Sequence, residues 1–590
     1  MDIKERVKKL RNLMEERGID AYIIPSSDPH QSEYVADRWR GRAWISGFTG
    51  SAGTVVITKD DGGLWTDGRY FIQAEDQLKG SGIRLFKMRE PKVPTITEYL
   101  VDTLKSGETV GFDGKLFSVT RVNNMKKEFD KNGIDINSDY DLVDEIWQDR
   151  PEIPKDKVFI HDVKYAGKSR AEKLKEVRNE MKKKKAKNYL ISSLDDIAWL
   201  FNLRGNDVNN SPVFISYALV TETRAYIFMD TNKVSEDIKE ELLKDDIKVK
   251  EYSELKNSLK KITDSILFDP LRTNYYMYKQ IPFNRDKIKD SEVTTKLKAV
   301  KNDTEIENLR NCHLKDGVAI VKFIHWLKNN VKDGNITEIS ADEKLTEFRS
   351  KQKDFISPSF DTIAAYKEHA AMMHYKATKE GQYTLKDEAM FLIDSGGQYL
   401  DGTTDITRTI VLGDITDEMK RDFTLTLKGH INLTIAKFLY GATGSNLDIL
   451  ARKPLWEYGI DYKCGTGHGV GFLLNVHEGP QNFSQVPNKV KLEKGMILTN
   501  EPGVYKKDKH GIRLENTLLV VEDEKTEFGQ FMKFDTISYC PLDLDGVDVN
   551  LLTEEERDWL NSYHKEVYDK LSPFLTEEEK AWLKEETRAI

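Results

Sequence analysis

The chain of 590 residues has few cysteines: Cys312, Cys464 and Cys540 are widely spaced, and no CxxC pair occurs. An odd count without close pairs argues against a disulfide framework and is typical of a reducing compartment. The sequence also lacks any run of about 18 apolar residues that could cross a bilayer, and its first helical stretch has no apolar signal core. These absences predict a cytoplasmic protein that does not enter membranes.

An excess of basic charge is missing as well. The sequence holds 90 Lys and Arg against 99 Asp and Glu, for a formal net charge of −9. Nucleic-acid-binding proteins usually carry a basic stripe, so no nucleic-acid partner is expected. The dense basic run "KKKKAK" at 182–187 lies in a mixed-charge helical pattern and is interpreted as a solvated helix face. A chain of this length is expected to form several domains.

An internal repeat organises the first half of the chain. A helical pattern that ends at Gly18 leads into the apolar stretch "AYIIPSS", and residues 169–196 repeat this plan. At one constant offset the same residue recurs in six pairs: Arg11 and Arg178, Asn12 and Asn179, Met14 and Met181, Tyr22 and Tyr189, Ile24 and Ile191, Asp28 and Asp195. The repeat predicts two similar α/β domains, residues 1–155 and 156–298, joined near the proline-containing "WQDRPEIPKDK".

A third domain is predicted for residues 299–590. Asn302 followed by Glu305 forms a capping-box pattern at the start of a long helical stretch. Near the C-terminus "LTEEERDWL" and "LTEEEKAWL" are two similar helix starts, which predict two packed helices in an extension of about residues 535–590. Their apolar faces are expected to contribute to a dimer. The fold class is therefore α/β (α+β).

Acidic residues in the third domain stand where a β-hairpin is expected. The stretch "DSGGQYLDGTTDITR" places Asp394, Asp401 and Asp405 between the apolar runs "AMFLID" and "TIVLG". Asp401 precedes a glycine and is interpreted as a turn residue. The other two lie on regular strands, where a buried carboxylate without a partner costs several kcal/mol or takes up a proton. A bound cation explains both.

Three further residues downstream complete a plausible ligand set. His468 lies in the glycine-rich "CGTGHGVGF", Glu501 ends an apolar strand before a Pro-Gly turn, and Glu515 lies within the strand pattern "GIRLENTLLVVED". Each signal alone is weak. Together they supply two Asp, two Glu and one His, so that four carboxylates balance two divalent cations. An oxygen-rich donor set favours Mn²⁺ over thiolate-preferring metals.

These residues, in this order, resemble the pita-bread metallopeptidases, and in particular the long, three-domain, cytosolic form of the aminopeptidase P (Xaa-Pro aminopeptidase) family. The similarity extends over essentially the whole chain. The stretches that carry it are "HQSEY", "SGFTGSAGT", "WTDGRYFIQA", "DDIAWLFNLRG", "HYKAT", "DGTTDITRT", "GTGHGVG", "NVHEGP", "TNEPGVY" and "GIRLEN". The resemblance implies two tandem creatinase-like domains, followed by a pita-bread catalytic domain, and a homodimer.

The resemblance also implies a ligand set and a reaction. Asp405 and Glu515 should bridge two metal ions, with Asp394 on one ion and His468 and Glu501 on the other. A metal-activated hydroxide would attack the bond between an N-terminal residue and a proline at position two of a peptide. Glu501 would carry the proton to the departing proline nitrogen, which has no N–H of its own.

Several other residues match family positions that contact the substrate. His374 and His477 correspond to histidines that contact the substrate and stabilise the tetrahedral oxyanion, and His468 contacts it as well. Arg69 matches an arginine of the first domain that reaches the substrate pocket. Arg513, two residues before Glu515, is expected to bind substrate or to orient that carboxylate.

Two departures from the family pattern concern the substrate pocket. Cys464 stands where a histidine is usual, four residues before His468, and "EHAAMM" replaces an Asn-Gly-Ala pattern before "HY".

Three other functions were weighed. A prolidase shares the metal site but cuts dipeptides, and a non-catalytic pita-bread protein binds peptides after losing metal ligands. The glycine-rich "GFTGSAG" and "GTGHGVG" fit neither GxGxxG nor the P-loop pattern of nucleotide enzymes. Two tandem N-terminal domains, the C-terminal extension and a complete ligand set favour the aminopeptidase.

Overall fold

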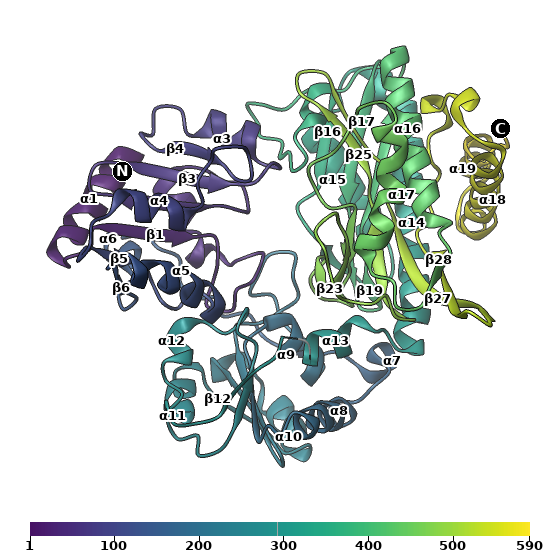
Figure 1. The fold of residues 1–590 in the computed structure, drawn as a ribbon. Coiled ribbons are helices and arrows are strands. Elements are labelled where there is room, and N and C mark those ends of the chain that lie inside the picture. Colours follow the sequence, from purple (N-terminus) through teal and green to yellow (C-terminus); the bar gives the residue numbers. More distant parts are fainter. Residues whose placement is uncertain (292) are drawn as a thin grey trace. The chain divides into compact units, whose positions relative to one another are not determined.

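The computed structural model describes residues 1–291 and 293–590, and the chain divides into two compact units (Figure 1). Unit 1 comprises residues 1–161 and 168–294, and unit 2 comprises residues 162–167 and 295–590. Both N-terminal repeats lie in unit 1. The boundaries given above for three domains therefore remain predictions.

Unit 1 contains the same six-stranded sheet twice. The first has the order β4 (Arg84–Lys87), β3 (Gly62–Thr66), β2 (Thr54–Thr58), β1 (Ala21–Pro25), β5 (Thr109–Gly111), β6 (Asp135–Asn137). The second has the order β12 (Ile247–Glu251), β11 (Ala225–Met229), β10 (Tyr217–Thr221), β8 (Asn188–Ile191), β13 (Ile266–Phe268), β14 (Lys287–Lys289). In each sheet the first strand in sequence is antiparallel to the second and parallel to the fifth. The predicted repeat is thus confirmed.

The repeat extends to the buried faces of the helices that precede the two sheets. Helix α1 (Ile3–Glu16) buries Val7, Leu10 and Met14, and helix α8 (Arg170–Lys183) buries Leu174, Val177 and Met181. These apolar residues recur three and four positions apart, which places them on one face of each helix. The other unit 1 helices include α2 (Gly41–Ser46), α3 (Phe71–Gln77), α4 (Ile96–Thr103), α5 (Val119–Lys131), α6 (Leu142–Ile146), α9 (Leu194–Phe201) and α10 (Glu236–Lys244).

Unit 2 is built on antiparallel sheets covered by long helices. Its largest sheet has the order β21 (Phe438–Leu439), β28 (Gly529–Thr536), β27 (Asn516–Thr526), β24 (Ile497–Asn500), β22 (Gly467–Gly469), β23 (Glu478–Phe483). A second sheet consists of β16 (Ile363–Tyr366), β17 (Met390–Ser395) and β20 (Ile406–Val411). Smaller sheets are formed by β15 (Phe355–Pro358), β18 (Gly397–Tyr399) and β19 (Gly402–Thr403), and by β25 (Gly503–Lys506) and β26 (His510–Arg513). Helices α16 (Asp417–Thr434) and α17 (Gly444–Trp456) pack side by side (Figure 1).

The helix that opens unit 2 begins as predicted. Helix α14 (Asp303–Asn330) has Asn302 as its N-cap, and the Asn302 and Glu305 side chains form the reciprocal capping box. Helix α15 (Glu338–Ser350) follows it. Among the described residues no helix is long and apolar enough to span a bilayer.

The C-terminal extension is part of the core of unit 2. Helices α18 (Glu554–Leu571) and α19 (Glu577–Glu586) start with capping boxes at Thr553 and Thr576, as predicted. Their buried side chains lie in one apolar cluster with residues of α14, α16 and β17; the cluster includes Leu560, Val567, Leu571, Leu583, Val321, Phe423, Leu427 and Met390. The apolar faces on which the expected dimer contact rests are therefore buried within their own chain, and the dimer itself stays a prediction.

Candidate metal and active site

Two aspartates enter the site from neighbouring antiparallel strands. Asp394 lies near the end of β17, opposite Thr407 of β20, and Asp405 directly precedes β20. Both carboxylates are buried. The hairpin that the sequence predicts thus brings the two acids to the same end of the strand pair, because residues before β20 lie beside residues at the end of β17.

His468 occupies a short strand within its glycine-rich stretch. It lies in β22 between Gly467 and Gly469 and pairs with β23 and β24. A Cβ atom on Gly467 would lie 1.9 Å from the Thr499 carbonyl oxygen, and one on Gly469 would lie 2.3 Å from that of Glu478. The flanking glycines are therefore needed for the close approach of neighbouring strands on both sides of the histidine.

The two glutamates stand at strand ends. Glu501 follows β24 directly, and the Thr499 hydroxyl donates to its Oε1 over 3.2 Å. Glu515 lies between β26 and β27, rather than inside one continuous strand as expected. Its Oε2 accepts a 2.7 Å hydrogen bond from the Thr407 hydroxyl, and its backbone N–H donates to the Thr407 carbonyl. Glu515 is buried and Glu501 is half-buried.

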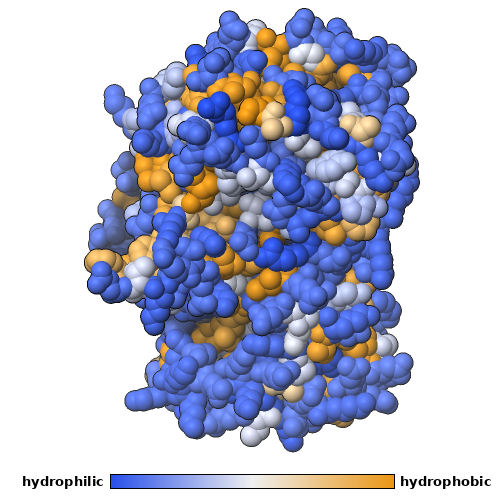
Figure 2. Space-filling model, turned by 90° about the vertical axis from the view of Figure 1, so that its right-hand side faces the viewer, coloured by the Kyte–Doolittle hydropathy of each residue, from blue (hydrophilic) through white to orange (hydrophobic). Residues whose placement is uncertain are grey.

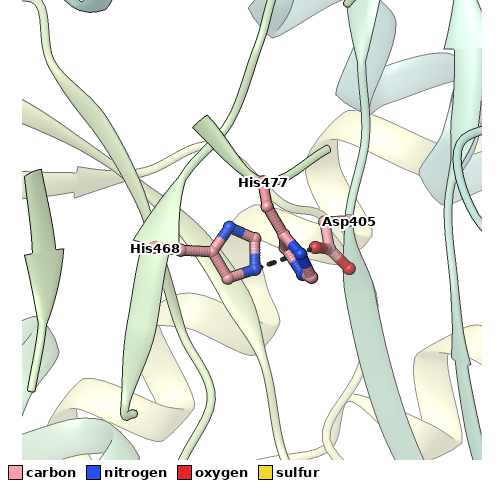
Figure 3. A group of neighbouring side chains, drawn as sticks. All are labelled: Asp405, His468 and His477. Carbon is pink, nitrogen blue, oxygen red and sulfur yellow. Dashed lines mark ion pairs between the residues drawn. The ribbon is translucent and has the colours of Figure 1, made fainter. Parts of the chain in front are cut away.

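All five predicted metal ligands converge in three overlapping groups, each with its donor atoms within 4.8 Å of one another. One group is Asp394, Asp405 and Glu515, the second is His468, Glu501 and Glu515, and the third is Asp405, His468 and His477. The His468 Nε2 lies 3.4 Å from Asp405 Oδ2 and 3.4 Å from Glu501 Oε1. Figure 3 shows the His468 ring directed toward the Asp405 carboxylate, with their ion pair as a dashed line, and the His477 ring close to both. The arrangement offers two adjacent places for cations with shared ligands.

Electrostatics of the site favour bound cations. Burial, together with the Asp394 charge, raises the pKa of Asp405 to about 6, although the His468 hydrogen bond opposes the shift. Burial and the neighbouring Asp405 charge also raise the pKa of Glu515 well above its ordinary value. Burial lowers the pKa of His468, but its hydrogen bond to Asp405 and the charge of Glu501 outweigh burial and raise it to about 9.

One buried oxygen of the site has no protein partner. Asp394 Oδ1 is buried and makes no hydrogen bond to any residue that the structure describes, whereas Oδ2 of the same carboxylate accepts one from Arg513. Buried polar atoms are almost always hydrogen-bonded, so an unpaired oxygen on a carboxylate that lies near Asp405 and Glu515 fits a metal ligand. The donor set therefore fits two divalent cations.

Arg513 acts on a different carboxylate than expected. Its Nη2 donates to Asp394 Oδ2 over 2.6 Å, and its Nη1 donates to the Tyr505 hydroxyl over 2.8 Å. Its Nε contacts the Thr407 hydroxyl, which in turn donates to Glu515. The expectation that Arg513 orients Glu515 directly is corrected: among the described residues Arg513 pairs with Asp394 and is linked to Glu515 through Thr407.

Asp401 belongs to none of the three groups. It lies in the turn before β19, and its carboxylate accepts hydrogen bonds from Lys315 and Asn311 of α14, each over 2.7 Å. The buried carboxylate is thus balanced by a lysine of the long helix, in keeping with a role outside the ligand set.

The predicted substrate-binding residues are spread over both units. His477 belongs to the third group and its ring centroid lies 4.1 Å from that of His468. His374 is half-buried in a turn after the 3₁₀ helix Lys367–Ala371, outside the three groups. Arg69 lies in unit 1, where it makes two hydrogen bonds of 2.8 Å to Asp67. The substrate roles of these residues stay predictions.

Sequence reasoning missed the threonines that hold the ligands. Thr407 and Thr499 each bind one glutamate through the hydroxyl, and Thr499 also accepts from the His468 backbone N–H. Both threonines stand two positions from a predicted ligand, Thr407 after Asp405 and Thr499 before Glu501. A period of two along a strand places them on the same face as that ligand, and this signal is readable from sequence.

Family models match almost the whole chain. Residues 6–146 and 149–305 each match a creatinase/prolidase N-terminal domain, residues 307–522 match metallopeptidase family M24, and residues 530–590 match the C-terminal region of peptidase M24. The two N-terminal matches coincide with the repeated sheets, and the M24 match contains all five candidate ligands.

Curated relatives are similar over the full length. Aminopeptidase P2 of Arabidopsis thaliana is 42% identical over 100% of this chain and 89% of its own. Xaa-Pro aminopeptidase 1 of Dictyostelium discoideum is 40% identical over 100% of this chain and 97% of its own.

Solved structures agree with these relatives. An X-prolyl aminopeptidase of Caenorhabditis elegans, described as a cytosolic enzyme with a dinuclear active site, superposes with a TM-score of 0.96 at 36% identity over 100% of both chains. A Bacillus anthracis Xaa-Pro dipeptidase covers 64% of this chain and 99% of its own, with a TM-score of 0.51 at 22% identity, and so shares the fold alone.

Proposed function

Because the chain belongs to the Xaa-Pro aminopeptidase (aminopeptidase P) family of M24 metallopeptidases, we propose that its dinuclear metal site is formed by Asp394, Asp405, His468, Glu501 and Glu515. The chain is a metallo-aminopeptidase of this family, and two divalent ions belong to its active site. The ligand assignment is the part that the proposal adds.

The observation that carries the assignment is the overlap of the three ligand groups. Asp405 and Glu515 together join Asp394 in one group, and each of them also belongs to a group with His468. This pattern supports bridging roles for Asp405 and Glu515, with Asp394 on one ion and His468 and Glu501 on the other. Two divalent ions held by these residues would lower the pKa of a water molecule bound between them toward neutrality.

The chain's own residues then supply orientation and proton transfer. Glu501 is half-buried and its carboxylate is held by the Thr499 hydroxyl, which fits a group that carries a proton to the departing proline nitrogen. His477, whose ring lies beside that of His468, would donate a hydrogen bond to the substrate carbonyl oxygen as negative charge develops there. His374 is proposed to contact the substrate as well.

The two arginines have separate proposed roles. Arg513 binds Asp394 through a charge-assisted hydrogen bond and so fixes the carboxylate proposed to bind one ion alone. Arg69 is proposed to reach the substrate, and its pairing with Asp67 fixes the direction of the guanidinium.

Manganese is proposed as the metal because carboxylate oxygens dominate the donor set and no cysteine belongs to the three groups. Thiolate-rich sites would favour other ions. The presence of a single imidazole among five ligands makes one ion chemically distinct from the other.

A homodimer and a cytoplasmic location complete the proposal. The described residues of unit 2 expose large apolar side chains on and after α17, namely Ile449, Trp456 and Tyr458. Such side chains suit an interface better than the C-terminal helices, whose apolar faces are already buried. Figure 2 shows separate apolar patches on one face of a mostly hydrophilic surface.

The activity is tested by the release of the first residue from an Arg-Pro-Pro peptide. We expect release after addition of Mn²⁺ to chelator-treated protein, and none from the N-acetylated peptide, because a free amino group is required. Arg-Ala-Pro should be cut poorly. Cleavage of Arg-Pro but not of Arg-Pro-Pro would instead identify a prolidase, and equal cleavage of the proline and alanine peptides would contradict the proposed specificity.

A further inference from the structure

A buried histidine on helix α16 lies behind the two glutamates. His430 is fully buried and contacts Asn500 and Asn516. Asn500 immediately precedes Glu501, and Asn516 immediately follows Glu515. The two asparagines are also direct partners in the antiparallel pairing of β24 and β27. The His430 side chain therefore contacts both strands next to the candidate ligands, at the end of β24 and at the start of β27.

Hydrogen-bond chemistry fixes the form of this histidine. Its Nδ1 lies 3.1 Å from the Asn500 carbonyl oxygen, which only accepts, so Nδ1 carries the proton. Burial and the nearby Arg408 charge lower the pKa of His430 to about 3, and the ring is neutral at working pH. Its Nε2 then accepts from the Asn516 side-chain amide over 3.2 Å. The Asn500 amide returns to the helix and donates to the His430 carbonyl over 2.8 Å.

The side-chain oxygen of Asn516 is also hydrogen-bonded, on the side away from His430. Its Oδ1 accepts from Arg408 Nη2 over 2.8 Å and from the Tyr563 hydroxyl over 3.3 Å. Arg408 also donates to the Glu515 backbone carbonyl over 2.6 Å, and Tyr563 belongs to the C-terminal helix α18. With the oxygen of the amide engaged in this way, its NH₂ group is the part that faces His430.

We propose that His430 is a positioning residue that sets the mutual placement of Glu501 and Glu515 by linking their neighbours Asn500 and Asn516. The inference rests on the proposed ligand roles of the two glutamates. These carboxylates come from different strands, and a small rotation of either backbone would move its oxygen away from a shared ion. Outer partners of metal ligands typically contribute about 10- to 100-fold in metal affinity or activity.

Three substitutions of His430 and one matched control separate positioning from stability. His430→Leu removes both hydrogen bonds, and His430→Gln keeps one donor and one acceptor at similar reach. His430→Asn has the same amide chemistry on a shorter side chain that does not span both partners. The control is His564→Leu in α18, because His564 is also fully buried and its Nε2 accepts from the Leu542 N–H. Among the described residues, His564 makes no hydrogen bond to a neighbour of a candidate ligand.

Each full-length variant is stripped with chelator and titrated with Mn²⁺ by calorimetry, and kcat, KM and the melting temperature are then measured. We expect His430→Leu and His430→Asn to lose about tenfold in Mn²⁺ affinity and kcat, with KM little changed, and His430→Gln to recover most of both. His564→Leu should lower the melting temperature alone. If His430→Leu does not fold, the contrast between the Asn and Gln variants makes the same test.

The inference is overturned if all folded His430 variants bind Mn²⁺ and turn over as the wild type does, or if the Gln variant loses as much as the Asn variant. Failure of the wild type itself to bind Mn²⁺ would overturn the proposed metal site instead, so that the two failures are distinguishable.

Discussion

Replacing Asp405 by asparagine should stabilise the metal-free protein while it destroys the metal site. Asp405 is buried, and burial with the Asp394 charge raises its pKa from 3.8 to about 6. In the fold the carboxylate therefore holds its proton to a higher pH than in the unfolded chain. Well below pH 4 the Asp405 carboxyl is protonated in the folded and in the unfolded state, so it does not change the free energy of unfolding. As the pH rises toward 6 the unfolded state ionises first, and the fold loses stability.

The size of this loss follows from the shift. One pKa unit corresponds to about 1.4 kcal/mol, so the ionised Asp405 destabilises the metal-free fold by about 3 kcal/mol at pH 7 and by about half of that at pH 5. An asparagine of the same shape carries no charge and avoids this loss. We therefore expect metal-free Asp405→Asn to melt several degrees above the metal-free wild type at pH 7, and less so at pH 5.

Added Mn²⁺ should raise the melting temperature of the wild type above that of Asp405→Asn. Mn²⁺ at about 100 times its dissociation constant stabilises a protein that binds it by about 2.7 kcal/mol per site. With two sites the wild type should gain about 5 kcal/mol, which exceeds the loss of about 3 kcal/mol, whereas Asp405→Asn lacks a shared ligand and should gain little. Differential scanning calorimetry of chelator-treated protein at pH 5 and 7, with and without Mn²⁺, makes the comparison. The reasoning is refuted if metal-free Asp405→Asn melts below the wild type at pH 7, or if Mn²⁺ stabilises both proteins equally.

Three further predictions concern residues outside the ligand set. Asp401→Asn should lower the melting temperature, because it leaves Lys315 without its carboxylate. Elemental analysis should still find the full metal content, and a loss of metal would contradict the assignment of Asp401 to a turn. Cys464→His should raise kcat/KM on Xaa-Pro peptides about tenfold at unchanged metal content, because a thiol is the weaker donor; a slower variant would refute this view of the pocket. Truncation before Leu551 should unfold unit 2 rather than yield a folded monomer, as followed by circular dichroism and light scattering; an unchanged melting curve would contradict it.

Much of the architecture could be predicted because it rests on local or repeated patterns. The capping boxes at Asn302, Thr553 and Thr576 depend on residues three positions apart, and all three are present. The tandem repeat was visible as identical residues at one offset, and the two sheets have the same strand order. The five candidate ligands were found from acids on apolar strands and one glycine-flanked histidine.

Other features depend on packing that a sequence does not encode locally. The C-terminal helices look amphipathic in isolation, but whether their apolar faces meet another chain or their own core is decided by α14 and α16, far away in sequence. Arg513 was assigned to Glu515 by its spacing of two residues, yet the strand breaks between β26 and β27 and the guanidinium turns to Asp394. The contact of His430 with two asparagines likewise brings together three distant segments.

The central claim is that five residues of unit 2 hold two ions that the aminopeptidase needs. The most direct measurement is the rate of arginine release from Arg-Pro-Pro as Mn²⁺ is added stepwise to chelator-stripped protein of known concentration. The account predicts that activity rises until two equivalents of Mn²⁺ per chain are bound and then levels off, and that Asp405→Ala shows no such rise. Full activity in the stripped protein, or a normal rise in Asp405→Ala, would contradict it.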